Sequence, residues 1–213
     1  MSIVNAADHA ANPAHLDTST GLDNRKMAFW TFIGSECLLF GSLIATYLAY
    51  KGRSLTGPLP HAGRTLGGQE SQGILDIPLT SLSTFVLLMS SLGMVLALAA
   101  VQRADRKGAI LWLFTTAGLG LVFLGFQAYE FNHFYHAGLT LQTNLFGSTF
   151  FLLTGFHGAH VFVGVIYLST LGMLAVKNQL GPERSMSVEI AGLYWHFVDV
   201  IWIVIFALVY LIK

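Results

Sequence analysis

The residues of this 213-residue chain that could carry chemistry are acidic and histidine side chains embedded in long apolar segments. A charged carboxylate at the centre of a membrane helix costs roughly 2.5–3.5 kcal/mol on insertion scales. Each such side chain must therefore be neutral, be paired with another group, or line a pathway for protons or ions. The candidate residues are Glu36, His157, His160, Glu189, His196 and Asp199.

Glu36 lies near the middle of the first apolar segment. If this segment is helical, Phe32, Leu39 and Phe40 share its face, whereas the small residue Gly41 points roughly the opposite way. Small residues usually mark close helix packing, so we expect Glu36 to face lipid or a loose cleft instead. Two interpretations are open: a neutral, hydrogen-bonded structural acid, and a proton-related or lipid-facing role.

Histidines and carboxylates on the last two apolar segments fall on shared faces. His157 and His160 are three residues apart, and Glu189, His196 and Asp199 cover one side of the final segment. A short loop joins the two segments, so we expect them to be antiparallel neighbours. Their polar side chains then form an interhelical polar clamp in which each buried group satisfies another. A haem or metal site and a proton-conducting path are the alternatives.

The metal interpretation lacks the motifs that bundle metal sites use. Di-iron sites combine carboxylates from several helices with Glu-x-x-His motifs. The motif from Glu130 to His133 lies at the far edge of the third apolar segment, where we expect a wetted interface. Cys37 is the single cysteine, which excludes a disulfide within the chain and a multi-cysteine metal site. We also expect Gly155 and Ala159 to give their segment a close neighbour.

The composition assigns these residues to a membrane protein. Apolar residues make up 54% of the chain and charged residues 10%, whereas about a quarter of a soluble domain is charged. The formal net charge is zero, so no basic surface for nucleic acid is present. Five apolar segments each exceed the roughly 20 residues needed to cross a bilayer. We therefore predict an all-α fold, a polytopic membrane helix bundle with five transmembrane helices. The predicted spans are residues 27–50, 78–101, 109–129, 145–176 and 189–212.

Basic residues predict the orientation of these helices. The N-terminal segment and the loops at 102–108 and 177–188 hold seven Lys and Arg residues, against four on the other side. The positive-inside rule then places the N-terminus in the cytoplasm. Residues 1–24 lack the basic and apolar regions of a signal peptide. We expect them to form a polar tail ahead of a membrane domain at residues 25–213.

Five motifs in chain order resemble subunit III of haem-copper terminal oxidases, the cytochrome c oxidase subunit III family. Residues 29–36 (FWTFIGSE) and 126–130 (FQAYE) resemble two of the family's helix motifs. Residues 146–151 (FGSTFF), 154–161 (TGFHGAHV) and 194–202 (YWHFVDVIW) are similar to later ones. The long family form has seven helices, and this chain resembles the short bacterial form, which lacks the first two.

The resemblance implies an accessory subunit of a proton-translocating oxidoreductase that reduces oxygen. Such a subunit has no catalytic residue, cofactor or metal of its own, and the haem and copper belong to partner subunits. The resemblance also implies direct contact with subunit I, association with other subunits including subunit II, and a bound phospholipid. The implied role is to stabilise the catalytic subunit and support proton uptake from the inner side of a bacterial inner (plasma) membrane. Glu36 then lies beside the lipid-facing part of the subunit, near the proton-uptake side of subunit I.

Two branches of the family and two other classes of protein compete with one another. Residues 127–130 and 155–158 favour the cytochrome c branch, whereas residues 35–40 and 45–47 lean toward the quinol branch. We favour cytochrome c oxidase; the alternative is subunit III of a quinol oxidase or of a nitric-oxide-reductase-associated relative. A membrane transporter would usually show helices broken by glycine or proline at its substrate site. A haem-binding membrane anchor would show a visible spectrum of its own.

Overall fold

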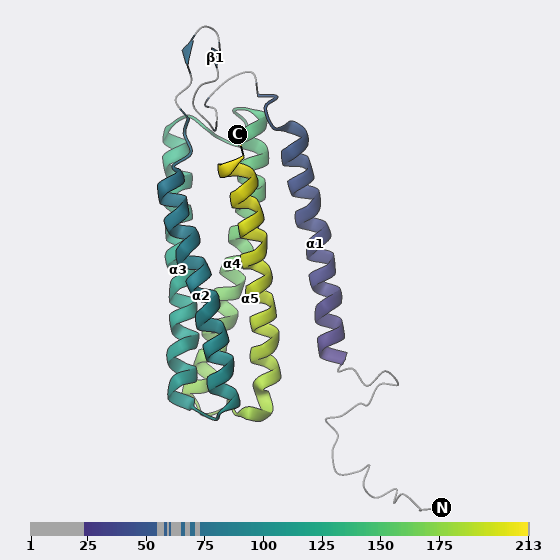
Figure 1. Cartoon of the computed structure of the whole chain (residues 1–213), viewed down its shortest axis with the longest axis vertical. Coiled ribbons are helices and arrows are strands. Elements are labelled where there is room, and N and C mark those ends of the chain that lie inside the picture. The colour runs from purple at the N-terminus through teal and green to yellow at the C-terminus, as the bar shows by residue number, and fades with distance from the viewer. Residues whose placement is uncertain are drawn as a thin grey trace, which may run out of the picture. The chain divides into compact units, whose positions relative to one another are not determined.

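Five long helices make up most of the structure, a computed structural model that describes residues 24–54, 58, 60, 65–66, 69–70 and 73–212. The predicted polar tail lies outside these residues, apart from Asn24. The helices are α1 (Asn24–Tyr50), α2 (Ile77–Gln102), α3 (Arg106–His136), α4 (Leu145–Val176) and α5 (Ser185–Phe206), which continues as a π-helical turn, Ala207–Leu211 (Figure 1).

All five helices are long and apolar enough to cross a membrane, which confirms the predicted fold class. The described part of the chain also contains one small hairpin, in which β1 (Thr65–Leu66) pairs antiparallel with β2 (Gln69–Glu70). The helix bounds follow the predicted spans with one large difference. The third helix reaches His136, whereas the prediction ended it at residue 129. Its last two turns therefore carry residues that the sequence assigned to a loop.

Short polar side chains begin three of the helices. Asp76 accepts a hydrogen bond from the backbone N–H of Leu79 at 3.1 Å, and Asp105 accepts one from Gly108 at 3.1 Å. Asn144 in the same way accepts one from the N–H of Gly147. These N-caps satisfy backbone donors that the first helical turn leaves unpaired. The starts of α2, α3 and α4 are thereby fixed by single Asp or Asn residues in the loops.

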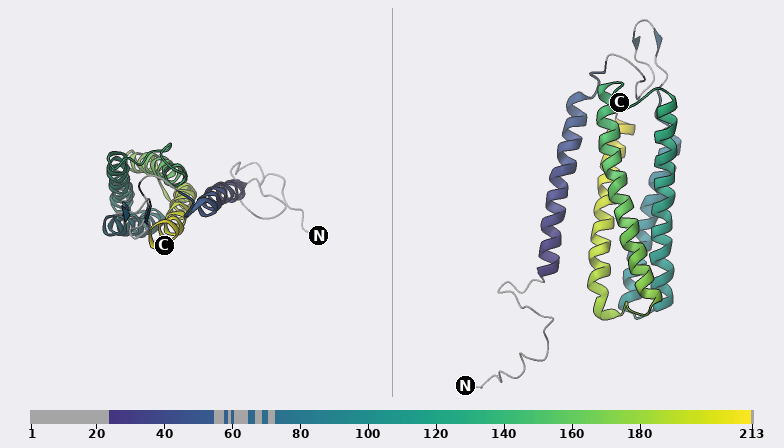
Figure 2. Two further views of the ribbon diagram at one scale, coloured as in Figure 1. Left: turned by 90° about the horizontal axis from the view of Figure 1, so that it is seen from above. Right: turned by 180° about the vertical axis from the view of Figure 1, so that it is seen from behind.

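Contacts within the chain define two units, Met1–Leu38 and Leu39–Lys213, and the boundary falls within α1. In the second unit, α2 packs on α3, α3 on α4, α4 on α5, and α5 back on α2. Seen from above, these four helices form a closed ring (Figure 2, left). Helices α4 and α5 are thus neighbours, as their short connection predicts, but α5 has a second neighbour in α2.

The ring closes around two tryptophans of α5, Trp195 and Trp202, whose side chains are fully buried. The indole N–H of Trp195 donates to Ser90 Oγ at 2.8 Å, and that of Trp202 donates to Thr84 Oγ1 at 2.9 Å. Both acceptors lie on α2. A buried indole needs an acceptor, so these two bonds fix the register of α5 against α2.

The Trp195 ring fits because α3 and α4 carry glycine where they approach it. A Cβ added at Gly164 would lie 2.7 Å from the Trp195 ring, and one at Gly120 would lie 2.6 Å from it. At Gly155, by contrast, an added Cβ meets no atom within 4 Å. The predicted close neighbour is therefore absent at Gly155 within the chain. Close approaches on this helix fall instead at Gly158, against Gln127, and at Gly164, against Trp195.

We predict that Gly164→Ala destabilises the chain, whereas the matched change Gly155→Ala on the same helix does not. The added methyl group at residue 164 must displace a buried indole ring, and such overpacking typically costs about 1–3 kcal/mol. The measurement is the thermal unfolding midpoint of the full chain purified in mild detergent. Equal midpoints for the two variants would contradict the packing described for Trp195.

The end of α1 is joined to the end of α5. The Lys51 ammonium donates to the backbone carbonyls of Leu208 at 3.2 Å and Ile212 at 2.6 Å. A cation suits these carbonyls because the C-terminal end of a helix carries partial negative charge. Partial burial lowers the pKa of Lys51 from its ordinary value. In addition, the loop after α1 is linked to the start of α4, because the backbone N–H of Phe146 donates to Ser54 Oγ.

Candidate functional site

The predicted site residues belong to both units of the chain. Glu36 lies midway along α1 in the first unit, and its side chain is partly exposed within the chain. Glu189 lies in the second turn of α5, also partly exposed. The other four residues, His157, His160, His196 and Asp199, lie within α4 and α5 of the second unit.

His196 and Asp199 meet a serine of α2 rather than the histidines of α4. The Ser91 hydroxyl donates to Asp199 Oδ2 and lies 3.0 Å from His196 Nδ1. The single proton of the Ser91 hydroxyl serves the bond to Asp199, and the hydroxyl oxygen also lies within hydrogen-bond distance of His196 Nδ1. A polar link across helices is present, and it joins α5 to α2.

His157 lies in the centre of the ring of helices and is fully buried. Its ring stacks on Trp202 with centroids 4.8 Å apart, and it meets the Phe123 ring edge-on at 5.8 Å. Neither ring nitrogen has a hydrogen-bond partner within the described structure. The expected clamp between His157 and the polar residues of α5 is therefore replaced by aromatic packing.

His160 contributes its backbone carbonyl to the contact between α4 and α5. Tyr194 OH donates to the His160 carbonyl at 3.0 Å. The His160 ring has its Nδ1 2.8 Å from the carbonyl of Phe156 on its own helix and packs edge-on against Phe40. Helices α4 and α5 are thus joined through a tyrosine that the sequence analysis did not single out.

The described residues contain no group of three or more His, Cys, Asp or Glu side chains that could hold a metal ion. The His157 ring is enclosed between Trp202 and Phe123, and His196 is engaged with Ser91. An axial haem ligand needs a free ring nitrogen facing an open space. The arrangement suits a structural role for the two histidines.

A second buried polar cluster surrounds Glu130, where the sequence analysis expected a wetted interface. That expectation is wrong, because only 5% of Glu130 is exposed. Its Oε1 lies 3.0 Å from Thr80 Oγ1 of α2, and its Oε2 accepts from Tyr210 OH of the π-helical turn at 2.8 Å. The signal in the sequence was the spacing of Phe123, Gln127, Glu130 and Phe134 on one helical face, all buried.

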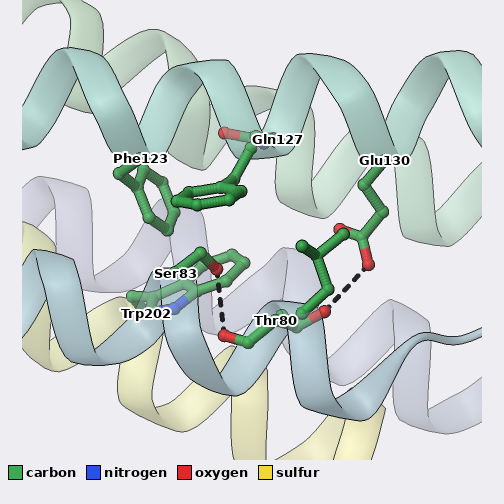
Figure 3. A pocket seen from close by; sticks show the side chains of 8 residues that line it. Thr80, Ser83, Phe123, Gln127, Glu130 and Trp202 are labelled. Carbon is green, nitrogen blue, oxygen red and sulfur yellow. Dashed lines mark hydrogen bonds between the residues drawn. The ribbon is translucent and has the colours of Figure 1, made fainter.

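A small cavity adjoins this cluster (Figure 3). Its volume is about 10 Å³, which is the size of a single water molecule. Ser83, Gln127 and Glu130 line it together with the aromatic rings of Phe123, Phe126 and Trp202. The Gln127 amide group donates to the Thr154 carbonyl at 2.6 Å, while its Oε1 has no partner within the described structure.

The fold and these sites define a multi-pass membrane protein whose buried polar groups serve neighbouring helices. The profile of the family described as Cytochrome c oxidase subunit III matches residues 10–213. The chain therefore belongs to the cytochrome c oxidase subunit III family, the non-catalytic subunits of haem-copper oxidases. The resemblance inferred from the five sequence motifs is confirmed.

Relatives of two kinds match most of the chain. Cytochrome c oxidase subunit 3 of Bacillus sp. (strain PS3) is 39% identical over 188 residues, which cover 88% of this chain and 86% of the relative. Quinol oxidase subunit 3 of Bacillus subtilis (strain 168) is 37% identical over 199 residues, which cover 93% of this chain and 92% of the relative. Cytochrome c oxidase subunit 3 of Alkalihalophilus pseudofirmus is 36% identical over 210 residues, covering 92% and 96%.

We predict that His196→Leu and Ser91→Ala each destabilise the assembled complex, and that their effects are not additive because both remove the same contact. Each removes one side of the part-buried contact between Ser91 and His196, and Ser91→Ala also leaves the buried Asp199 without its donor, at a cost of about 1–3 kcal/mol. The double variant should therefore cost clearly less than the sum. The measurement is a double-mutant cycle on the thermal stability of the purified complex, with its haem spectrum recorded in parallel.

The matched control is Thr170→Ala, because the exposed Thr170 hydroxyl donates to the Ile166 carbonyl of its own helix. This variant should leave both stability and spectrum unchanged. Strictly additive losses for Ser91 and His196 would contradict the shared hydrogen bond. Stoichiometric haem bound by the pure chain through His196 would overturn the structural role.

Proposed function

We propose that this chain stabilises the catalytic subunit of a proton-pumping terminal oxidase and sustains its proton uptake during aerobic respiration. The observation that carries the proposal is the family match across residues 10–213. The buried polar groups support it, because they are used for contacts between helices and not for a substrate path. The haem and copper that reduce oxygen then belong to partner subunits, and bound phospholipid is part of the proposal.

The proposed partners are oxidase subunit I, in direct contact, and subunit II within the same complex. We place the protein in the inner membrane of a bacterial cell with its N-terminus in the cytoplasm. The support is the excess of basic residues in the loops at 102–108 and 177–188. Arg106, the first residue of α3, also fixes this end of α3 to the end of α4, because its guanidinium donates to the carbonyl of Ala175.

We propose cytochrome c as the electron donor of the complex, with quinol as the second candidate. Named relatives of both kinds match the chain at similar identity, 39% and 37%. The wording of residues 127–130 and 155–158 supports the first, and the relatives named quinol oxidase subunit 3 support the second.

Affinity purification of the tagged chain in mild detergent tests the proposed partners. We expect a haem-copper catalytic subunit and subunit II to co-purify, with a haem spectrum that disappears when the chain is separated from them. Activity of the purified complex with reduced cytochrome c and with a quinol then identifies the donor. Recovery of the chain alone, with its own Soret band, would instead support a haem-binding anchor. Recovery without haem or partners would support a transporter.

We predict that Glu36→Gln modulates the oxidase without abolishing its activity. Glutamine preserves the shape and hydrogen bonding of a neutral acid, and a neutral acid is the favoured form in mid-membrane. Oxygen reduction by the assembled complex should fall at most severalfold, with the loss growing during turnover. Reaction with a hydrophobic carbodiimide should be lost at the same time.

The control for this prediction is Glu183→Gln, which changes an exposed glutamate in the short turn Pro182–Arg184 outside the long helices. It should leave both the turnover and the carbodiimide reaction as in the unchanged complex. Complete and immediate loss of oxygen reduction in a fully assembled Glu36→Gln complex would make Glu36 an obligatory proton carrier.

A further inference from the structure

The cluster around Glu130 joins three separate elements of the second unit at one buried carboxyl group. Glu130 lies on α3, Thr80 on α2 and Tyr210 on the π-helical turn after α5, and all three are at most 5% exposed. Figure 3 shows Glu130 reaching from α3 toward Thr80. The carboxyl group is therefore a permanent part of the protein interior.

The hydrogen bonds of Thr80 can be assigned by counting protons. Thr80 Oγ1 lies 2.8 Å from the Asp76 carbonyl and 3.0 Å from Glu130 Oε1. A carbonyl oxygen only accepts, so a proton on Glu130 Oε1 would let the single Thr80 proton serve the Asp76 carbonyl alone. If Glu130 were ionised, that one proton would have to be shared between the Asp76 carbonyl and the carboxylate, as in a three-centre hydrogen bond.

The second oxygen and the surroundings agree with this assignment. Tyr210 OH donates to Oε2, which serves as the carbonyl oxygen of a neutral acid. None of the residues that line the adjoining cavity is cationic, and the ionisable groups that act on Glu130 among the described residues are Tyr210 and the N-cap residue Asp76. A carboxylate here would be buried with no counter-ion among the described residues, which is costly.

The cavity and a groove on the surface of the chain share two lining residues. Leu79 and Phe126 line both the cavity of about 10 Å³ and an open groove of about 470 Å³ between α2 and α3. The groove also borders Asp76 and Tyr129, at the end of the helices where α2 begins. One water molecule in the cavity would stand between the carboxyl group and the groove.

We propose that the Glu130 pocket is a proton-holding site, a neutral carboxylic acid bonded to Thr80 and Tyr210, whose proton exchanges through a single water molecule and the Leu79–Phe126 gap. The exchange balances because the water accepts the Glu130 proton while it returns one of its own protons to the carboxyl group, which leaves both neutral, and the water molecule itself then exchanges through the groove. Glu36 is not part of this cluster and belongs to the other unit of the chain.

Infrared spectroscopy of the purified oxidase complex tests the protonation state. A protonated carboxyl group has a C=O stretching band that a carboxylate lacks. At neutral pH, Glu130→Gln should remove one such band relative to the unchanged complex, and the exposed-site control Glu183→Gln should remove none. Identical spectra in this region for the unchanged complex and Glu130→Gln would overturn the proposal.

Two further variants keep the test valid if Glu130→Gln assembles poorly. Thr80→Val removes the acceptor of the acid proton, and Tyr210→Phe removes the donor to the carbonyl oxygen. Each should shift the frequency of the same band while leaving the carboxyl group in place. A band unmoved by both changes would show that it does not come from Glu130 in this cluster.

The exchange route is tested by transferring the complex into heavy water and following the downward shift of the band. Leu79→Ala opens the gap and should speed the shift at least severalfold. Leu82→Ala is the matched control, because Leu82 is exposed on α2 and lines neither the cavity nor the groove. Equal exchange rates for the two variants would exclude the proposed route.

Discussion

The second unit of this protein depends on finding a hydrogen-bond acceptor for two indole N–H groups inside a membrane. The hydrocarbon offers no water, so a polar group left alone there costs several kcal/mol. Ser90 accepts from Trp195 and Thr84 accepts from Trp202. Each hydroxyl also donates its own proton to a carbonyl of α2, that of Leu87 or that of Thr80. Donors and acceptors therefore balance in each link without any solvent.

Helix α5 carries most of the polar contacts that close the ring, and they follow one another along its length. Trp195, Asp199 and Trp202 contact α2, and Tyr210 contacts α3 at the end of the element. Their spacing of three to four residues, with a longer step to Tyr210, places them along one side of the helix. The large Trp195 ring also needs space on α3 and α4, and glycine at residues 120 and 164 provides it. Large side chains on α5 and missing ones on its neighbours are thus two parts of one packing arrangement.

The sequence predicted the helices well because the length of an apolar segment can be read from the residues of that segment alone. It predicted the partners of polar residues poorly, because a helix's own spacing shows which residues share a face but not which neighbour that face meets. His196 and Asp199 were correctly placed on one side of the last helix. The short loop before α5 favoured α4 as their neighbour. The ring also brings α2 against α5, and no motif around Ser91 identified this serine as their partner. Glu130 was misjudged for another reason: the third helix continues beyond the apolar run, so a residue assigned to its edge is buried within it.

The same physical constraint explains how a chain with histidine and acidic residues inside its membrane helices can serve as a non-catalytic subunit. In a soluble protein, buried His, Asp and Glu side chains often indicate a functional site, because such groups are more stable at the surface, where water solvates them. Within a membrane bundle they can instead replace water as partners for hydroxyl, phenol and indole groups. His157 shows the limiting case, where the ring packs between Trp202 and Phe123 as an aromatic side chain. In this chain, the hydrogen-bond partners of a buried polar residue therefore say more about its role than its residue type does. Those partners differ between Glu130 and Asp199. Glu130 has both oxygens in hydrogen bonds to two other elements, whereas Asp199 has one oxygen bonded to Ser91 and the other without a partner in the described structure.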